Sequence, residues 1–432
     1  MLMPMTLAQK VIAQACGRGE ISVGEVVNVE PHLFSLIDLV MPHYLKMLAD
    51  HGVNRLRYPE RCIVFSDHEV PAQSVRVAAL QKALRQQMRD YGIEHFYQQG
   101  RHGISHQAIV EYGHVLPGML VLCADTHGTT LGCVGALSPP INYEMIQALA
   151  SGEIWLQVPE TIQVTLCGKL RAGVLSRDIA LHVGQRLGPE TCDYRVIEYA
   201  GPALADLGMD ARMTLCNAAV DMGAKAAVVP ADHVTQAYLR GRTSQPWTPV
   251  ASDPDAMFSH RLEVDLGALE PLVAAPPTPA NLVPISSLAG QAVDQVYIGS
   301  CGGGRMEDLH AAAGVLRGRK VHGNVRMLVV PTSQEIYAEA ARAGLLEVFA
   351  GAGAMVLTPS CGPCYGNLSP LVDGEVCIGT GTTNMPGRMG SSNATIYLAN
   401  AAVSAACAVA GQIIAPDELP PLIADTVVKV AA

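Results

Sequence analysis

Two hydrophobic periodicities take turns along the chain and together predict an α/β fold. Residues 74–92 (SVRVAALQKALRQQMRDYG) repeat apolar side chains at helical spacing, whereas residues 62–65 (CIVF) form a short apolar run typical of a buried strand. Towards the C-terminal end the alternation becomes regular, with strand-like and helical segments in turn at 295–301, 305–316, 326–332, 333–345 and 355–361. Such alternation predicts parallel sheets whose strands are joined by crossover helices.

Changes in this pattern divide the chain into three α/β regions. They cover residues 1–155, 156–275 and 286–432, with a linker between the last two at 276–285. The linker is expected because residues 273–284 (VAAPPTPANLVP) contain four prolines and no charge. A length of 432 residues fits two or three domains of ordinary size.

The composition is that of a globular protein with a large core. Hydrophobic residues make up 49% of the chain and charged residues 16%, so the chain is not expected to be disordered. The net charge is −10 and there is no Lys/Arg-rich block. These two features argue against nucleic acid or an anionic membrane as the main partner, and favour a small polar substrate.

No export signal or membrane span is expected. Residues 1–17 (MLMPMTLAQKVIAQACG) lack the basic start, continuous apolar core and small-residue cleavage site of a secretory signal, which predicts a cytoplasmic protein. The one stretch similar to a membrane span, residues 395–414, is interrupted by Asn400, Ser404 and Gln412. We therefore expect it to be a buried core helix.

Cysteine supplies the first candidate chemistry. The chain has twelve cysteines, and a reducing cytoplasm disfavours disulfides, so most are expected to be small buried hydrophobic residues. Cys301 and Cys361 differ because each directly follows a strand-like run, and Cys364 lies in the same loop as Cys361. Ligands collect at the carboxyl ends of strands in parallel sheets, so we expect these cysteines to share one site.

The pair Cys361 and Cys364 (CGPC) is open to several interpretations. A thioredoxin-like redox dithiol would begin a long helix, which Gly366 and Pro370 discourage. Structural zinc takes four ligands, and the chain has no second close pair. Incidental burial is disfavoured by the glycine or proline beside each cysteine. Three thiolates can also hold a cube of four irons with one iron left open, which would act as a Lewis acid on a hydroxyl or a water.

Five motifs together resemble the aconitase superfamily. They are HGISHQAIVE (102–111), ADTHGTTLGCVGAL (124–137), GSCGGGRMEDL (299–309), PSCGPCYGN (359–367) and NMPGRMG (384–390). The likeness spans nearly the whole chain and is greatest to the large subunits of 3-isopropylmalate dehydratase and homoaconitase. It implies three α/β domains around a central cleft and a [4Fe-4S] cluster. It also implies a separate small subunit, because the family's fourth, swivelling domain with its serine base and arginines is not expected on this chain.

The resemblance assigns cluster binding and acid–base roles to individual residues. It implies that the [4Fe-4S] cluster is bound by Cys301, Cys361 and Cys364. It also implies three acid–base pairs, namely Asp67 with His68 beside the leaving hydroxyl, His106 with Asp125, and His127 with Asp221. A histidine held by a carboxylate is a suitable proton donor near neutral pH.

The resemblance also implies which residues contact the substrate, namely Arg388, Asn217, Thr126 and Thr383. An arginine such as Arg388 suits a planar carboxylate because its guanidinium is a planar fork. Asn217 lies four residues before Asp221 on an expected helix, which would place both on one face.

Several positions depart from the family pattern. Thr383 stands where the pattern S-N-R-N-F-x-G-R has its first arginine, so one positive charge is missing. Gly302 and Gly303 replace the last two residues of the pattern S-C-T-N, and the pattern D-S-H-T has become DTHG at residues 125–128. These changes are expected around the substrate and not at the cysteines, which predicts retained cluster chemistry in an altered pocket.

The leading hypothesis is therefore an iron–sulfur-dependent hydro-lyase that acts on a malate-type dicarboxylic acid together with a small subunit. Among substrates, 3-isopropylmalate ranks first, a small diacid of the maleate or citraconate type second, and homoaconitate third. Two alternatives come from other classes. One is a non-catalytic, iron- or redox-responsive protein that keeps the cluster, and the other is a thiol oxidoreductase in which Cys301 would be dispensable.

Overall fold

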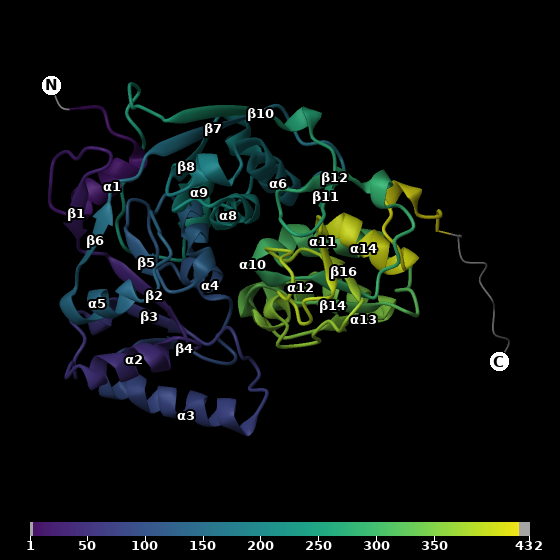
Figure 1. Ribbon diagram of the computed structural model, residues 1–432, viewed down its shortest axis with the longest axis horizontal. Helices are drawn as coiled ribbons and strands as arrows, with labels where there is room; N and C mark the ends of the chain where they lie inside the picture. Colours follow the sequence, from purple (N-terminus) through teal and green to yellow (C-terminus); the bar gives the residue numbers. More distant parts are fainter. Residues whose placement is uncertain (1–2, 423–432) are drawn as a thin grey trace.

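The structure, a computed structural model, confirms the α/β class (Figure 1). It describes residues 3–422, so residues 1–2 of the first expected region and 423–432 of the third lie outside the described residues. The strands form three sheets and one two-stranded ribbon. Within residues 3–422, no helix combines the length and the apolar sequence that a bilayer crossing requires.

The first sheet contains four parallel strands in the order β4-β3-β2-β5, and an antiparallel ribbon of β1 and β6 lies at its side. The strands are β1 (Val26–Val29), β2 (Leu33–Ile37), β3 (Cys62–Phe65), β4 (His95–Tyr97), β5 (Val121–Cys123) and β6 (Ile154–Gln157). The helices of this part are α1 (Leu7–Ala15), α2 (Met41–Asp50), η1 (Pro59–Arg61), α3 (Val75–Asp90), α4 (Ser105–Glu111), η2 (Thr126–Val134) and α5 (Glu144–Ser151).

The helix predicted at 74–92 is α3, and its start follows from its sequence. The Ser74 hydroxyl accepts a hydrogen bond from the Val77 amide at 3.2 Å, which satisfies a free N–H of the first turn. Val77, Leu84 and Met88 are buried at helical spacing. The helix therefore covers the sheet with one apolar stripe.

The second sheet also contains four parallel strands, in the order β10-β7-β8-β9. They are β7 (Thr161–Cys167), β8 (Val196–Ala200), β9 (Ala226–Val228) and β10 (His260–Asp265). The accompanying helices are α6 (Ser176–Leu187), α7 (Pro189–Cys192), η3 (Pro202–Asp206), α8 (Met209–Asn217), η4 (Val220–Met222), α9 (His233–Leu239) and η5 (Leu266–Ala268).

The third sheet contains seven strands in the order β12-β11-β17-β16-β13-β14-β15. They are β11 (Leu272–Ala274), β12 (Leu282–Pro284), β13 (Gln295–Ile298), β14 (Arg326–Val329), β15 (Met355–Val356), β16 (Val376–Gly379) and β17 (Thr395–Leu398). The helices are η6 (Ile285–Leu288), α10 (Ser300–Gly303), α11 (Met306–Leu316), α12 (Gln334–Arg342), α13 (Leu345–Ala352), η7 (Gly362–Tyr365), α14 (Ala401–Ala410) and η8 (Pro416–Glu418). The strands from β13 to β17 are parallel, as the alternating pattern predicted.

The residues expected to form a linker, 276–285, instead turn the chain back within the third sheet. β11 pairs antiparallel with β12, with Val273 opposite Val283. Pro276, Pro277 and Pro279 lie in the turn between these strands, where their missing N–H groups break no ladder hydrogen bond. The third sheet therefore begins at β11, before the expected boundary.

The stretch 395–414 was expected to be one buried helix and is a strand followed by a helix. β17 pairs parallel with β16, and α14 begins only after Asn400. The Asn400 side chain accepts a hydrogen bond from the Val403 amide at 2.9 Å and so caps the helix. The expected burial is confirmed, because residues 401–408 of α14 are all buried.

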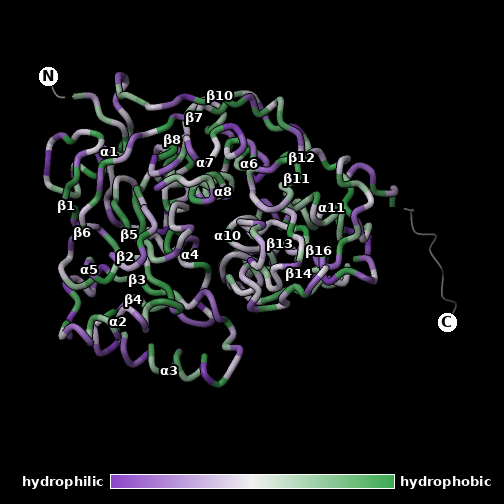
Figure 2. Tube along the Cα trace, in the orientation of Figure 1, coloured by the Kyte–Doolittle hydropathy of each residue, from purple (hydrophilic) through white to green (hydrophobic). Residues whose placement is uncertain are grey.

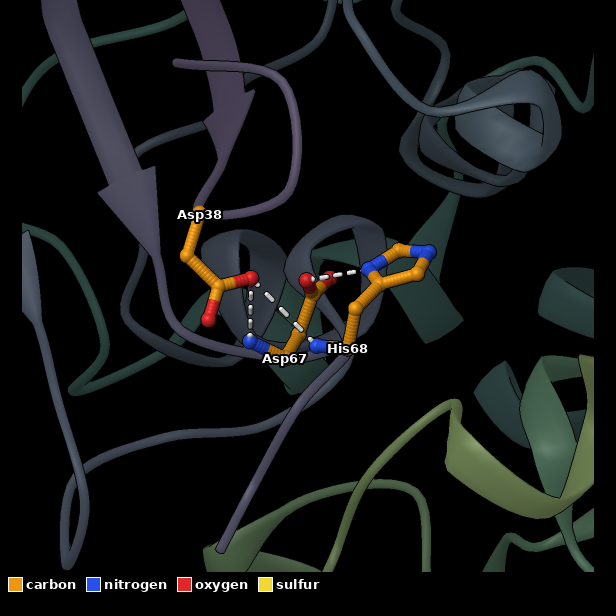
Figure 3. A group of neighbouring side chains, drawn as sticks. All are labelled: Asp38, Asp67 and His68. Carbon is orange, nitrogen blue, oxygen red and sulfur yellow. Dashed lines mark hydrogen bonds and ion pairs between the residues drawn. The ribbon is translucent and has the colours of Figure 1, made fainter. Parts of the chain in front are cut away.

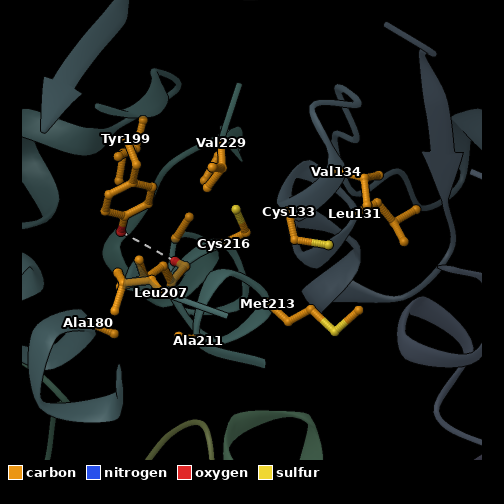
Figure 4. Close-up of a cluster of buried hydrophobic side chains, with 14 of the residues drawn as sticks. Leu131, Cys133, Val134, Ala180, Tyr199, Leu207, Ala211, Met213, Cys216 and Val229 are labelled. Carbon is orange, nitrogen blue, oxygen red and sulfur yellow. Dashed lines mark hydrogen bonds between the residues drawn. The ribbon is translucent and has the colours of Figure 1, made fainter. Parts of the chain in front are cut away.

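The first and second sheets share one hydrophobic core (Figure 4). Leu131, Cys133 and Val134 of η2 face Met213 and Cys216 of α8 across it. Figure 2 shows the hydropathy of each residue along the chain. Apolar stretches such as the buried strand β3 lie inside, and polar residues lie along outer turns. Burial of this continuous apolar surface holds the two sheets together.

Gly132 of η2 packs directly against β9 of the second sheet. Its carbonyl accepts a hydrogen bond from the Val229 amide at 2.9 Å, directly after β9. A Cβ atom on residue 132 would lie 1.7 Å from the Ala227 carbonyl oxygen, which is far inside van der Waals contact. Only glycine therefore permits this approach.

We expect Gly132→Ala to lower the midpoint of thermal unfolding by about 5 °C or more, because the added methyl must push η2 away from β9. Gly314→Ala is the matched control, since Gly314 lies inside α11 and a Cβ there meets nothing within 4 Å. It should leave the midpoint unchanged or raise it slightly. Equal midpoints for the two variants would contradict this account of the contact.

Candidate active site

Loops from the carboxyl ends of strands in the first and third sheets meet in one place. Asp67 lies two residues after the end of β3, and Cys361 lies in the loop after β15. The Cys361 amide donates a hydrogen bond to the Asp67 carbonyl at 2.8 Å, which fixes the two loops together. Figure 1 shows α4, α8 and α10 lying between the sheets at this position.

The three predicted cysteines lie together and are buried. The Ser300 hydroxyl lies 3.7 Å from the Cys301 sulfur and 3.4 Å from the Cys364 sulfur, so both thiols surround the same oxygen. The Arg388 guanidinium donates a hydrogen bond to the Cys364 sulfur at 3.5 Å. The neighbouring Cys361 thiol, together with Arg388, lowers the pKa of Cys364 well below its usual value. Cys364 therefore ionises readily, whereas burial raises the pKa of Cys301 to about 12.

Asp67 and His68 form the shortest acid–base contact in this region (Figure 3). The His68 Nδ1 atom lies 2.6 Å from Asp67 Oδ1, and the other carboxylate oxygen accepts a hydrogen bond from the Ser105 amide at 2.9 Å. Burial alone would lower the pKa of His68, but Asp67 and the more distant Asp125 and Asp38 raise it to about 9. The imidazole is therefore protonated at neutral pH.

Asp38 supports this pair from the end of β2. Its Oδ1 atom accepts hydrogen bonds from the backbone amides of Asp67 and His68, each at 3.4 Å (Figure 3). Burial and the neighbouring Asp67 raise the pKa of Asp38 to about 7. Sequence patterns did not single out Asp38, because one aspartate after a buried strand carries no motif.

Asp125, directly after Ala124 at the end of β5, lies among three histidines. Its carboxylate oxygens are 3.7 Å from His68 Nε2, 3.6 Å from His106 Nε2 and 3.9 Å from His127 Nδ1. Burial alone would raise the pKa of Asp125, and the three histidines lower it. The carboxylate therefore stays ionised and can orient all three rings.

His106 is the most deeply buried of the three. Burial lowers its pKa to about 3, so its ring is neutral at physiological pH. Neither ring nitrogen has a hydrogen-bond partner among the described residues. A buried polar group without a partner is costly, and one of these two atoms, Nε2, lies 3.6 Å from the Asp125 carboxylate. A bound molecule can supply the missing partner.

Asn217 and Asp221 both reach the site but do not share one helix. α8 ends at Asn217, and Asp221 lies in the separate turn η4, which stops at Gly223 in a left-handed conformation. The Asn217 amide donates to Thr130 Oγ1 at 3.0 Å, and Asp221 lies 3.3 Å from His127 Nε2. The expected helix face is thus wrong. Burial would lower the pKa of His127, and Asp221 raises it.

Two of the departures from the family pattern, Gly302 and Gly303, lie where a side chain has no room in this chain. A Cβ atom would lie 2.6 Å from the Thr380 carbonyl oxygen at Gly302, and 2.5 Å from the Thr380 Cβ at Gly303. Thr380 in turn donates from its hydroxyl to the carbonyls of Gly299 and Gly303, each at 2.9 Å. The cysteine loop therefore packs directly on the end of β16, and this packing leaves no room for side chains.

The remaining predicted substrate residues lie around the same region with different exposure. Thr126 is exposed at the start of η2, between Asp125 and His127, whereas Thr383 is half-buried. Thr382, which the motifs did not single out, places its hydroxyl 3.9 Å from the Cys364 sulfur. The sequence did not predict that the Ser300 hydroxyl contacts the thiols. Its position directly before Cys301, at the end of a strand, would have indicated this contact.

Comparison with known proteins agrees with this geometry. A family model described as "Aconitase family (aconitate hydratase)" matches residues 9–411. The chain is similar to "3-isopropylmalate dehydratase large subunit 1" of Methanopyrus kandleri, with 40% identity over 96% of this chain and 99% of that protein. It is also similar to "3-isopropylmalate dehydratase large subunit" of Aquifex aeolicus, with 38% identity over 96% of this chain and 98% of that protein.

We expect Asp67→Asn to lower the pKa of His68 from about 9 towards its ordinary value, because the neutral amide no longer stabilises the charged ring. The raised pKa means that His68 stabilises the fold below about pH 6.5 and that this stability is lost as the pH rises through 9. Histidine NMR titration, with the His68 signal assigned from His68→Gln, measures the pKa directly. Asp50→Asn on the surface of α2 should leave the titration unchanged. An unshifted His68 pKa in Asp67→Asn would refute the assignment of its cause.

Proposed function

The chain belongs to the aconitase family, and we propose that it is the large subunit of a hydro-lyase that acts on a malate-type dicarboxylic acid. The membership that the five motifs implied is confirmed by the match over residues 9–411. One observation carries the proposal, namely that three buried thiols and a group of histidines and carboxylates adjoin in one place.

We propose that Cys301, Cys361 and Cys364 bind a [4Fe-4S] cluster. The donor set fits this group, because the soft sulfur ligands Cys301 and Cys364 both approach the Ser300 hydroxyl, Cys361 lies in the same buried loop as Cys364, and Arg388 contacts the Cys364 sulfur. When bound by three thiolates, such a cluster supplies one iron without a protein ligand, which acts as a Lewis acid on a hydroxyl or a water. The residues around it would then manage the protons.

His68 is the proposed donor of a proton to the leaving hydroxyl. Its pKa of about 9 keeps the ring charged at neutral pH. Asp67 holds Nδ1, and the other ring nitrogen, Nε2, lies 3.7 Å from Asp125. His106 is neutral and His127 is paired with Asp221, so these two would orient substrate and water through hydrogen bonds. Two rings with opposite pKa shifts thus offer different roles at one pH.

Arg388 is the proposed partner of one substrate carboxylate. It lies beside the cysteines, and its Nε atom has no hydrogen-bond partner among the described residues. A guanidinium that is largely buried and incompletely paired suits a planar anion. The relatives' names rank 3-isopropylmalate first as substrate, ahead of a maleate- or citraconate-type diacid and of homoaconitate.

A small subunit is the proposed partner. The matched relatives are named large subunits, and the alignments cover 98% to 100% of those relatives. In the family, the swivelling domain carries the serine base and further arginines, so a separate chain would complete the site from the open side of the cleft.

Two other functions are less well supported. A non-catalytic iron-responsive protein would not need a histidine held in its charged form beside a second, neutral histidine. A thiol oxidoreductase would need an accessible dithiol, and Cys361 and Cys364 are both buried despite the low pKa of Cys364.

The proposed function predicts turnover after anaerobic reconstitution with iron, sulfide and a candidate small subunit. We expect hydration of at least one unsaturated diacid among isopropylmaleate, citraconate and maleate, measured by loss of absorbance of the double bond. The large subunit without its partner serves as the control and should show little activity. If the assembled enzyme carries its cluster and still hydrates none of these acids, the proposed function is wrong.

Separate variants test the cluster and the proton donor. Cys361→Ser should lose bound iron and labile sulfide, whereas Cys407→Ala, which changes a buried cysteine of α14, should retain both. His68→Gln should keep the cluster but lower kcat by about 100-fold or more. His260→Gln at the exposed end of β10 should leave kcat unchanged. Full activity in His68→Gln would exclude the proposed proton donor.

A further inference from the structure

A pocket next to the cysteines is lined mainly by apolar residues. It lies between α6, η4 and the turn that joins β11 to β12, and it holds about 510 Å³ of space free of protein atoms, including its mouth. Its apolar lining includes Ala180, Leu181, Gly184, Met222, Pro279 and Ala280. The pocket has space for a small aliphatic group.

The same pocket shares two lining residues with the candidate active site. Thr382 lines it and also approaches the Cys364 sulfur at 3.9 Å. Asp221 lines it and also contacts His127 at 3.3 Å. The pocket therefore adjoins the place where the cysteines and histidines meet.

Arg177 of α6 is the one cation in the pocket lining, and it is 3% exposed. Its two terminal nitrogens donate to the carbonyls of Gly302 and Gly381, and its Nε atom has no partner among the described residues. No carboxylate of residues 3–422 forms an ion pair with it within 4.0 Å, unlike Arg212, which pairs with Asp232 at 2.7 Å. A buried guanidinium without a counter-ion is unfavourable, so the site favours an anion.

Glycine at residue 302 is what lets Arg177 reach this place. A Cβ atom there would lie 2.7 Å from the Arg177 Nη1 atom. Arg177 thereby comes to the loop after β16 that contains Gly381 and Thr382. The next residue in this loop is Thr383, which stands where the family pattern has an arginine. The charge approaches from α6 of the second sheet.

Building on the proposed function, we propose that Arg177 binds one carboxylate of the substrate and that the adjoining apolar pocket accepts an alkyl substituent of the same molecule. In this arrangement, α6 and the turn between β11 and β12 determine the size of the substituent that the site accepts. Arg177 acts as a binding and specificity-determining residue, distinct from the groups that move protons.

Binding of unreactive analogues tests this inference without turnover. Succinate, methylsuccinate and isopropylsuccinate are titrated by calorimetry into the full chain, reconstituted anaerobically and mixed with its small subunit. Wild type should bind isopropylsuccinate about tenfold or more tightly than succinate, because the alkyl group leaves water. Arg177→Gln should weaken both by about tenfold or more, and Arg177→Lys should weaken them less. Arg186→Gln, an exposed change on α6, should bind like wild type.

A second variant tests the apolar wall. Gly184→Ala adds a methyl 3.3 Å from Met222 Cγ and should reduce the preference for isopropylsuccinate over succinate. It lies inside α6, where alanine favours the helix, so it remains informative if Arg177→Gln does not fold.

Three results would overturn the inference: wild-type affinity in a folded Arg177→Gln, an unchanged alkyl preference in Gly184→Ala, or no binding of any succinate by wild type. Failure of the proposed function looks different. If the assembled enzyme hydrates no diacid but still binds the succinates in a way that depends on Arg177, the proposed reaction is wrong and the proposed binding site is supported.

Discussion

The hydrogen bond between the Cys361 amide and the Asp67 carbonyl joins the two halves of the candidate site. On one side it continues through the Asp67 carboxylate to His68 and to the Ser105 amide at the start of α4. On the other side it sets the loop that carries Cys361 and Cys364. The acid–base residues come from the first sheet and the sulfur ligands from the third, so their relative position depends on this contact. Both loops follow the carboxyl ends of parallel strands, where binding sites collect in α/β proteins.

Buried charge governs the chemistry of this region. Asp125 lies within 3.9 Å of three histidine rings, yet these rings are held in different states. His68 has a carboxylate at each ring nitrogen and keeps its proton, whereas His106 meets only Asp125 and loses its proton to burial. Arg388 and the low-pKa Cys364 compensate each other nearby. The Asp125 carboxylate thus contacts a charged ring, His68, and a neutral ring, His106. Ion pairing outweighs the cost of burial at His68, and burial outweighs ion pairing at His106.

The sequence predicted the α/β class and the grouping of Cys301, Cys361 and Cys364, since cysteines at strand ends in a parallel sheet must come near one another. Other features depend on packing that has no local pattern. Arg177 is one arginine in an amphipathic helix, and its importance appears only when Gly302 and Gly381 are seen against it. The break between Asn217 and Asp221, and the hairpin in place of a linker, likewise arise from tertiary contacts that outweigh spacing and composition.

The proline-rich turn between β11 and β12 forms part of the roof of the apolar pocket through residues 278–280, yet it contributes no ligand to the thiols and no member of the histidine group. Its strands are anchored at the edge of the seven-stranded sheet, away from the central pairings. Lengthening or replacing this turn would therefore change the size of the apolar pocket and leave the cysteines and histidines of the candidate active site unchanged. Exchange of this turn alone is therefore a route to variants that accept other substrates.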